Sequence, residues 1–164
     1  MLESLVEKDQ AVSGPISTTF LILLRAILEL IFSLVERLPK TVADSERLSN
    51  YIKDEADFKK GVLRSKVFMP RKDKKVSVFR TTDCDNFKIW WISDWYVYRK
   101  IRQKAVARAD LQAKVVRELD MKVVSTNLPR SRRHADIKGW PDDDQKALQF
   151  SLELAHKSRL VIRG

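Results

Sequence analysis

The stretch PRSRRHADIKGWPDDDQ, residues 129–145, concentrates more side chains capable of chemistry than any other short part of the chain. A neutral imidazole of His134 could act as a general base while the neighbouring Arg132 and Arg133 hold a phosphate. Arg80, in the predicted strand SVFRTT, could join them from a neighbouring strand. Together these side chains would make a metal-independent centre for cleaving RNA.

Cleavage of RNA by this route needs a second proton donor beside the general base. The chain has two histidines, and the other one, His156, is expected at the end of a distant helix. A single histidine in an arginine-rich loop more often packs or binds than reacts. We therefore expect this segment to contact an anion, and catalysis at His134 is the alternative.

Aromatic rings and cations follow one another in DNFKIWWISDWYVYRKIRQ, residues 85–103. Six aromatic side chains lie within twelve residues and lead into four cations. Proteins that bind single strands or RNA stack bases on such rings and hold the backbone with such cations. Most of the rings should pack in a core, so we expect the tryptophans inside and the tyrosines outside. The residues predicted to contact nucleic acid are Arg80, Tyr96, Tyr98, Arg99, Lys100, Arg102, Lys104, Arg130, Arg132 and Arg133.

Patterns typical of other chemistries are missing from the sequence. The four glycines do not cluster, so no glycine-rich phosphate loop is present. Cys84 and Ser93 have no recognisable base beside them and are expected to be structural. One cysteine and two histidines make no set with zinc-ligand spacing, and we expect no metal and no cofactor. The acids at 142–144 follow Pro141 and precede an apolar run, where they favour a helix cap.

The charge of the chain is unevenly distributed. The formal net charge is +10 over 164 residues. Residues 59–133 contain 21 Lys and Arg against 7 Asp and Glu, a balance of +14, whereas residues 1–45 contain 4 basic and 6 acidic side chains. Such a basic body attracts polyanions, usually nucleic acids or anionic membranes. A solvated surface kept soluble by its charge is the alternative. A single cysteine fits a reducing cytosol, so we expect a cytoplasmic protein.

An apolar helix is predicted in ISTTFLILLRAILELIFSLVERLPK, residues 16–40, because apolar residues recur at alternating spacings of four and three. Arg25 and Glu29 near its centre weigh against a membrane span and against a secretory signal peptide. We expect residues 16–38 to pack against a protein partner or a second copy of the chain. Contact with a membrane interface and packing on the chain's own body are the alternatives.

A boundary is predicted in TVADSE, residues 41–46, which divides the chain into residues 1–45 and a basic body of residues 46–164. Short strands mixed with helices indicate an α+β fold. We expect a small mixed domain with a C-terminal amphipathic helix, preceded by a separate apolar N-terminal helix. The elements predicted for the body are short helices at 48–58 and 109–119, strands at 62–70, 75–82, 121–126 and 159–163, a helix starting at Asp83 or Asp85, a basic loop from 129, and an amphipathic helix over 142–158.

The pieces KVFMP, SVFRTT, IWW, ARADL and RHADIKGWP, in this order and spacing, resemble those of a family of small uncharacterised bacterial proteins known only as hypothetical proteins. The resemblance covers residues 47–163 and leaves the N-terminal helix outside. It implies that the helix is an accessory to a self-contained body. The family carries no activity, cofactor or substrate over to this chain.

These patterns favour binding over catalysis. We expect a nucleic-acid-binding accessory subunit of a larger bacterial complex, which contacts phosphate through a basic surface flanked by aromatic rings. One alternative is a small metal-independent nuclease or toxin-like effector centred on His134. The other is a membrane-associated effector that uses the N-terminal helix.

Overall fold

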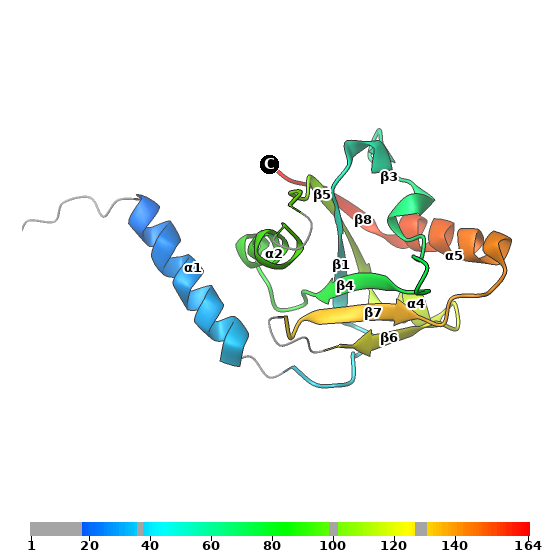
Figure 1. Ribbon diagram of the computed structural model, residues 1–164, viewed down its shortest axis with the longest axis horizontal. Coiled ribbons are helices and arrows are strands. Elements are labelled where there is room, and N and C mark those ends of the chain that lie inside the picture. The colour runs from blue at the N-terminus through cyan, green and yellow to red at the C-terminus, as the bar shows by residue number, and fades with distance from the viewer. Residues whose placement is uncertain (1–17, 36–37, 99–101, 127–130) are drawn as a thin grey trace, which may run out of the picture.

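The computed structural model describes residues 18–35, 38–98, 102–126 and 131–164. Six strands form one sheet: β1 (Arg47–Ile52), β4 (Val76–Arg80), β5 (Ala107–Gln112), β6 (Lys122–Ser125), β7 (His134–Lys138) and β8 (Arg159–Ile162). Their order is β6-β7-β4-β1-β5-β8, and each neighbouring pair is antiparallel (Figure 1). β2 (Phe58–Lys59) and β3 (Val62–Leu63) form a separate two-stranded hairpin.

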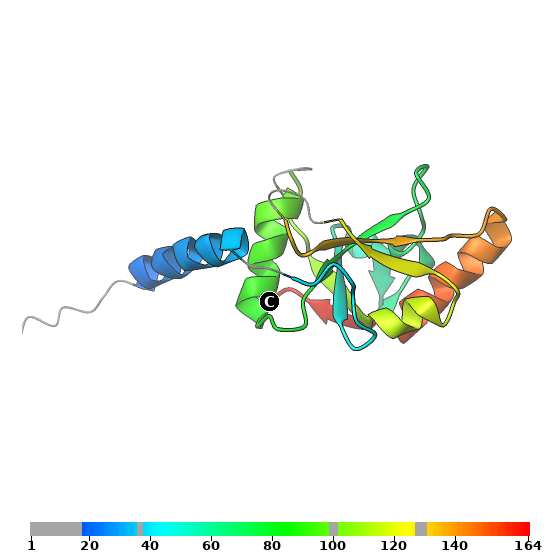
Figure 2. The ribbon, with the colours of Figure 1, turned by 90° about the horizontal axis from the view of Figure 1, so that it is seen from below.

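Helices pack on both faces of this sheet (Figure 2). α5 (Asp144–Lys157) and the short α4 (Ala113–Arg117) cover what we call the α5 face. α2 (Asn86–Ile92), which continues into the π-helical turn η3 (Ser93–Val97), covers part of the opposite, α2 face. Side chains alternate between the faces along each strand. Leu48 and Val78 therefore join the core under α5, and Tyr51 and Phe79 join the core under α2. The α+β fold with a C-terminal helix is confirmed.

Two helices begin at aspartates, as the sequence predicts. The carboxylate of Asp85 accepts a hydrogen bond from the backbone N–H of Lys88 at 2.8 Å and caps α2. The carboxylate of Asp143 accepts one from the backbone N–H of Lys146 at 2.6 Å and caps α5. Each bond satisfies an N–H group that has no partner within its helix. The acids at 142–144 thus include a helix cap.

Some of the predicted elements are wrong, although the strands predicted at 75–82, 121–126 and 159–163 are confirmed by β4, β6 and β8. Residues 48–58 form β1 and the 3-10 turn η1 (Glu55–Asp57) instead of a helix. Residues 62–70 contain only β3 and the 3-10 turn η2 (Ser65–Val67). Residues 109–112 belong to β5, so the helix predicted at 109–119 is confined to α4. The predicted basic loop contains β7. Pairing with neighbouring strands overrides local preference in these segments.

α1 (Thr18–Val35) lies at one end of the molecule, beyond α2 (Figure 1). Residues 16, 17, 36 and 37 of the predicted apolar segment lie outside the described residues. Within the described part of the chain, no helix combines the length and apolar character needed to cross a bilayer. Eight large apolar side chains of α1 are between 42% and 58% exposed: Phe20, Leu21, Ile22, Leu23, Leu24, Ile27, Leu28 and Ile31.

The segment between α1 and β1 is attached to the body. Val42 is 2% exposed and belongs to the core of the α5 face. The guanidinium of Arg117 donates hydrogen bonds to the carboxylate of Asp44 and to the carbonyl of Val42. Arg80 donates one to the carbonyl of Pro39 at 2.6 Å. The predicted boundary between residues 45 and 46 therefore falls inside a segment that packs with the body.

Candidate nucleic-acid interface

The α2 face of the sheet is covered over one half only. The Tyr51 hydroxyl donates a hydrogen bond to the carbonyl of Ile89 at 2.6 Å, which fixes α2 over β1. Across β4, β7 and β6, Ser77 is exposed and Val124 is 37% exposed. The register places both residues beside Asp136 on this same face. We call this region the open sheet surface; it consists of Lys75, Ser77, Lys122, Val124, His134, Asp136 and Lys138.

Lysines are concentrated on the open sheet surface. Lys122 and Lys138 are directly opposed across β6 and β7, so their Cβ atoms are about 4.5–5.5 Å apart. Like charges at that spacing destabilise a strand pair. Lys75 lies just before β4, with its ammonium 3.0 Å from the carboxylate of Asp73. The hydrogen bond to Asp73 raises the pKa of Lys75, and the charges of Asp73 and Asp136 add to that effect. An anion lying across these lysines would relieve their repulsion.

His134, the first residue of β7, lies at the end of the open sheet surface that is nearest to α2. Its Nδ1 is hydrogen-bonded to the hydroxyl of Thr126, and its Nε2 lies 3.9 Å from Oδ1 of Asp136. The imidazole stands edge-on to the ring of Phe79, with centroids 5.3 Å apart and an interplanar angle of 84°. Asp136 is 4% exposed and accepts a hydrogen bond from Ser77 Oγ at 3.3 Å. These contacts hold the imidazole in place beside a buried carboxylate.

Aromatic rings of α2 and η3 border the open sheet surface. Tyr96 stacks on Phe79 with ring centroids 6.3 Å apart and an interplanar angle of 27°. Trp91 stacks on Trp95, with ring centroids 5.5 Å apart and an interplanar angle of 8°. Trp91 also contacts Tyr96 edge-on, with ring centroids 6.2 Å apart. Trp91, Trp95 and Tyr96 are half-buried, so part of each ring faces solvent. Aromatic rings at the surface of single-strand binders accept stacked bases without sequence preference. We call these three rings the aromatic border.

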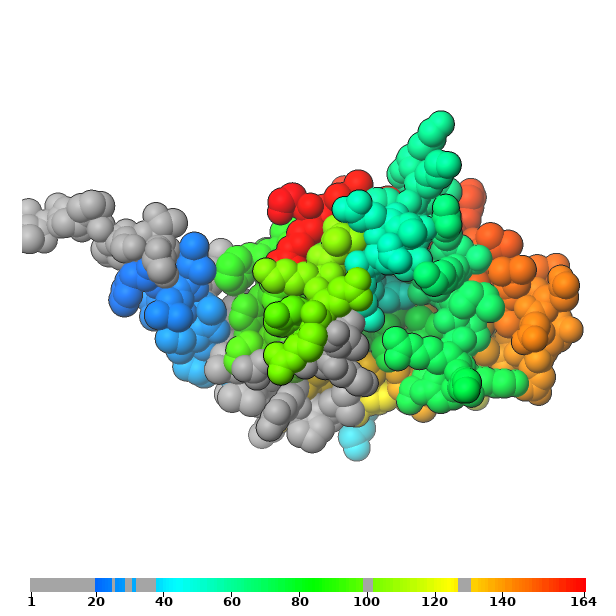
Figure 3. Space-filling view, turned by 45° about the horizontal axis from the view of Figure 1, so that its top comes forward, coloured from blue at the N-terminus to red at the C-terminus, as the bar shows by residue number. Residues whose placement is uncertain are grey.

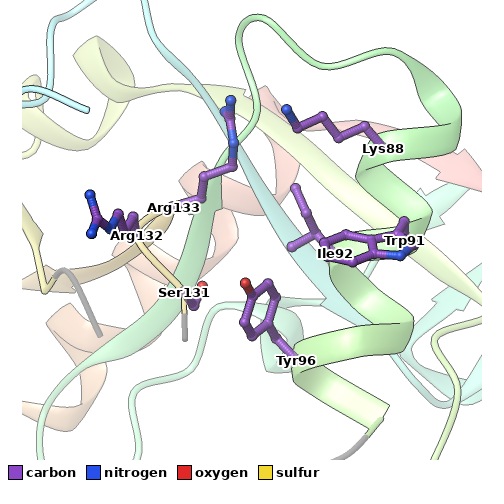
Figure 4. Close-up of a pocket in the computed structure, with 7 residues that line it drawn as sticks. All are labelled: Lys88, Trp91, Ile92, Tyr96, Ser131, Arg132 and Arg133. Carbon is purple, nitrogen blue, oxygen red and sulfur yellow. The ribbon is translucent and has the colours of Figure 1, made fainter. Parts of the chain in front are cut away.

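A small pocket lies where the aromatic border meets the start of β7 (Figure 4). Its volume is about 10 Å³, which is room for about one water molecule. Ser131 is 4% exposed, and its Oγ has no hydrogen-bond partner among the described residues. Figure 4 shows the Ser131 and Tyr96 hydroxyls facing each other. The residues that line the pocket are Lys88, Trp91, Ile92, Tyr96, Ser131, Arg132 and Arg133.

Two of the predicted contact residues are buried. Arg80 is 1% exposed, and its guanidinium donates two hydrogen bonds to the carboxylate of Glu46, at 2.6 and 2.8 Å. Burial raises the pKa of Glu46, but hydrogen bonds from Arg80 and Ala43 outweigh it and bring the pKa below the ordinary 4.5. Arg133 is 6% exposed and donates a hydrogen bond to the carbonyl of Arg80 at 2.9 Å, yet it lines the pocket. The guanidinium of Arg80 is thus enclosed by protein groups, away from the open sheet surface.

The other predicted contact residues are not gathered at one place, because Lys104 lines a separate hollow beside Phe58 and Ile162. Tyr96 and Arg132 are half-buried at the pocket. Tyr98 is half-buried just after η3, and Arg102 and Lys104 are exposed before β5. The remaining predictions, Arg99, Lys100 and Arg130, lie outside the described residues. The fold therefore brings part of the aromatic segment together with residues 131–133 at one pocket.

Four cations near this surface are missing from the sequence-based prediction: Lys75, Lys88, Lys122 and Lys138. A signal for part of this set exists in the sequence, because polar residues alternate with apolar ones at 134, 136 and 138. Alternation places those side chains on one face of a strand. It does not give the register that sets Lys122 against Lys138, since register depends on the partner strand.

A buried polar network lies beneath α2 and contacts the ring of Trp90. Ser49 Oγ donates a hydrogen bond to Asp110 at 2.6 Å, and Arg108 Nε donates one to the same carboxylate at 3.0 Å. The Trp90 ring packs against the guanidinium groups of Arg108 and Arg163, whose central carbons lie 4.9 and 5.2 Å from its centroid. We interpret this network as structural. In the described part of the chain, no group of three or more His, Cys, Asp or Glu is placed to hold a metal ion.

Comparison of the chain with protein-family models, with curated proteins and with solved structures gave no match. The resemblance stated for residues 47–163 stays a prediction.

Proposed function

We propose that the protein is a nucleic-acid-binding accessory subunit of a larger bacterial complex, and that it holds a single strand across the open sheet surface. The observation that carries the proposal is the direct opposition of Lys122 and Lys138, with Lys75 on the same face. A repulsive arrangement of this kind costs stability in the free protein. Neutralisation by phosphates would compensate for that cost when a strand is bound.

The path of the strand follows β7. Arg132 lies near one end of this path and Lys138 at the other, six residues further along the chain, which is about 20 Å of extended backbone. The half-buried ring faces of Trp91 and Tyr96 lie at the Arg132 end. Phosphates would meet the lysines and arginines while bases stack on the rings, a combination that single-strand binders use.

The exposed surface of α1 supports the role as a subunit. Five consecutive residues, 20 to 24, are all large, apolar and at least 42% exposed. Successive residues of an α-helix advance by about 100°, so five of them surround the helix axis completely. A single partner helix covers only a narrow stripe. A partner that surrounds α1 with several helices fits this distribution better than a two-stranded coiled coil.

Binding is tested by fluorescence anisotropy with labelled single-stranded RNA and DNA between about 50 and 200 mM salt. The logarithm of the binding constant should fall linearly with the logarithm of the salt concentration, with a slope of about −0.7 per neutralised phosphate. Replacing Lys75, Lys122 and Lys138 together with Gln should flatten the slope by about 2 units.

The matched control replaces three exposed lysines of α4 and α5, Lys114, Lys146 and Lys157, with Gln. It removes the same charge from the opposite face and should change the slope by much less. Absence of binding by the folded wild-type protein at about 50 mM salt would contradict the proposed function. An equal loss in both triple variants would show that the strand does not lie on the open sheet surface.

A further inference from the structure

β8 is an outer strand of the sheet, and its outer edge is open. Among the strands that the structure describes, only β5 pairs with β8. The backbone N–H of Arg163 donates a hydrogen bond to the carbonyl of Val106, just before β5, at 2.9 Å. Backbone groups of an antiparallel strand alternate between its two sides, so those of Leu160 and Ile162 are directed away from β5. Their N–H and C=O groups form a template for another strand.

The composition of β8 does not protect this edge. Proteins commonly block an open strand edge with lysines, prolines or a bulge. Three of the four residues of β8 are apolar, Leu160, Val161 and Ile162, and Ile162 is 60% exposed. By contrast β6, the strand at the opposite edge of the sheet, carries Lys122. The edge of β8 is therefore suited to the addition of a strand from another chain.

A hollow of about 370 Å³ lies at the end of β8. Ile162 and Arg163 line it together with Phe58 of β2 and with residues 104–106, which lead into β5. Phe58 is half-buried and packs against the core of the α5 face. Figure 3 shows the C-terminal residues, in red, at the surface next to the cyan segment that follows β1. When a strand is added to a sheet edge, pockets beside the edge hold its side chains and give specificity.

The charges around this edge favour an acidic partner. Arg159, at the start of β8, is exposed, and so is Lys104 at the hollow. Glu55 is the acidic residue among those that line the hollow, and Arg163 is paired with Asp94. The formal net charge of the chain is +10. A second copy of the chain would therefore be repelled, whereas an acidic segment would be attracted.

We infer that the outer edge of β8 binds an extended, acidic peptide segment of a partner protein, which joins the sheet as a further strand. One apolar side chain of the peptide would occupy the hollow, and its acids would lie near Arg159 and Lys104. This edge is separate from the open sheet surface, which lies on β4, β7 and β6 at the other end of the strand order. The inference does not depend on the binding of nucleic acid.

The probe is a library of random 12-residue peptides displayed on phage and selected on the full-length protein. We expect enriched peptides to be rich in acids and to alternate apolar residues with others. Proline should be rare in them, because it cannot donate a hydrogen bond to a neighbouring strand. Ile162→Pro removes one outward N–H group and keeps those that face β5. It should weaken the binding of an enriched peptide by about 10-fold.

Reversal of charge tests the acidic character of the partner. Lys104→Glu and Arg159→Glu should each weaken the binding of an enriched peptide by about 3-fold, as expected for exposed ion pairs. Lys122→Glu, on the strand at the opposite edge, is the matched control and should leave the binding unchanged. Equal effects of all three variants would overturn the placement of the peptide on β8.

Hydrogen exchange measured by NMR gives a second readout that needs no variant. In the free protein, the N–H groups of Leu160 and Ile162 should exchange faster than that of Val161, which faces β5. An enriched peptide should slow the exchange of Leu160 and Ile162 by at least about 10-fold. Absence of enriched peptides, or enriched peptides that leave these two groups unprotected, would overturn the inference. Protection of the two groups by single-stranded RNA and by no peptide would also overturn it.

Discussion

The guanidinium of Arg80 and the carboxylate of Glu46 form a two-point pair, in which Nε donates to Oε2 at 2.6 Å and Nη2 donates to Oε1 at 2.8 Å. The pair joins the end of β4 to the residue before β1, and the Arg80 side chain is 2% exposed. Removing one partner of such a pair leaves the other charge without compensation in a desolvated site. Arg80, which the sequence predicts as a phosphate contact, instead connects two strands.

Replacing Arg80 with Met should lower the free energy of unfolding by about 3 kcal/mol, because Glu46 loses its partner and the Pro39 carbonyl loses a donor. Urea denaturation followed by circular dichroism measures the change. Lys72→Gln, at an exposed position, is the control and should stay within about 0.5 kcal/mol of the wild type. Weaker binding of nucleic acid by Arg80→Met at unchanged stability would instead place Arg80 in the interface.

The pH dependence of stability should carry a contribution from Glu46. The folded-state pKa of Glu46 is lowered below the ordinary 4.5, so its stabilising effect is fully present above that pH and disappears as the pH falls through the folded-state pKa. The free energy of unfolding should therefore fall less steeply below about pH 5 in Glu46→Gln than in the wild type. The pKa values of Asp73 and Asp142 are also lowered, but both residues remain in both proteins. Parallel curves would contradict the role given to Glu46.

Replacing His134 with Gln should change the affinity for a single strand by less than about 1 kcal/mol, because Gln keeps the capacity for hydrogen bonding. Replacing Arg132 and Arg133 together should cost more, since hydrogen bonds from cations are stronger. The same protein samples, incubated with labelled RNA and DNA, measure turnover. A nuclease activity that His134→Gln reduces by a factor of about 10² to 10⁴ would favour the catalytic alternative.

Truncation at two points should separate α1 from the segment that follows it. Removal of residues 1–37 should leave a folded body that no longer captures a partner or self-associates. Removal of residues 1–45 should in addition lower the melting temperature, because it deletes the core residue Val42 and the Asp44 partner of Arg117. Calorimetry and light scattering on the two proteins check this. Equal melting temperatures would show that residues 38–45 contribute nothing to the body, and binding of lipid vesicles only by the full chain would favour a membrane partner for α1.

The sequence predicts elements well where local signals agree with the fold. Asp85 and Asp143 precede helical patterns and do cap helices, and β4, β6 and β8 contain the β-branched residues typical of strands. The sequence does not predict β1, because the polar residue Ser49 of RLSNYI faces a buried network under α2. A strand with this composition is favourable only when its two partner strands are in place. Pairing of this kind depends on residues about 30 and 60 positions away.

The candidate site is predictable only in part for the same reason. The sequence shows that Arg132 belongs to an arginine-rich segment and Tyr96 to an aromatic one. That both residues line one pocket depends on how α2 lies over the sheet. Lys122 and Lys138 each look like an ordinary exposed lysine of a strand. Their opposition is a property of the β6–β7 register, which no single segment contains.

The central position of β1 in the sheet also affects the rate of folding. β1 pairs with β4 on one side and with β5 on the other, so Leu48 must meet both Arg80 and Leu111. Each of these pairings closes a long loop of chain. The chain loses conformational entropy in this step before hydrogen bonds between the strands compensate for the loss. Domains dominated by such distant pairings fold in milliseconds to seconds instead of microseconds. During that interval the apolar residues of α1 are exposed beside an incomplete sheet. Early binding of α1 by the proposed partner would therefore protect the newly made chain from aggregation.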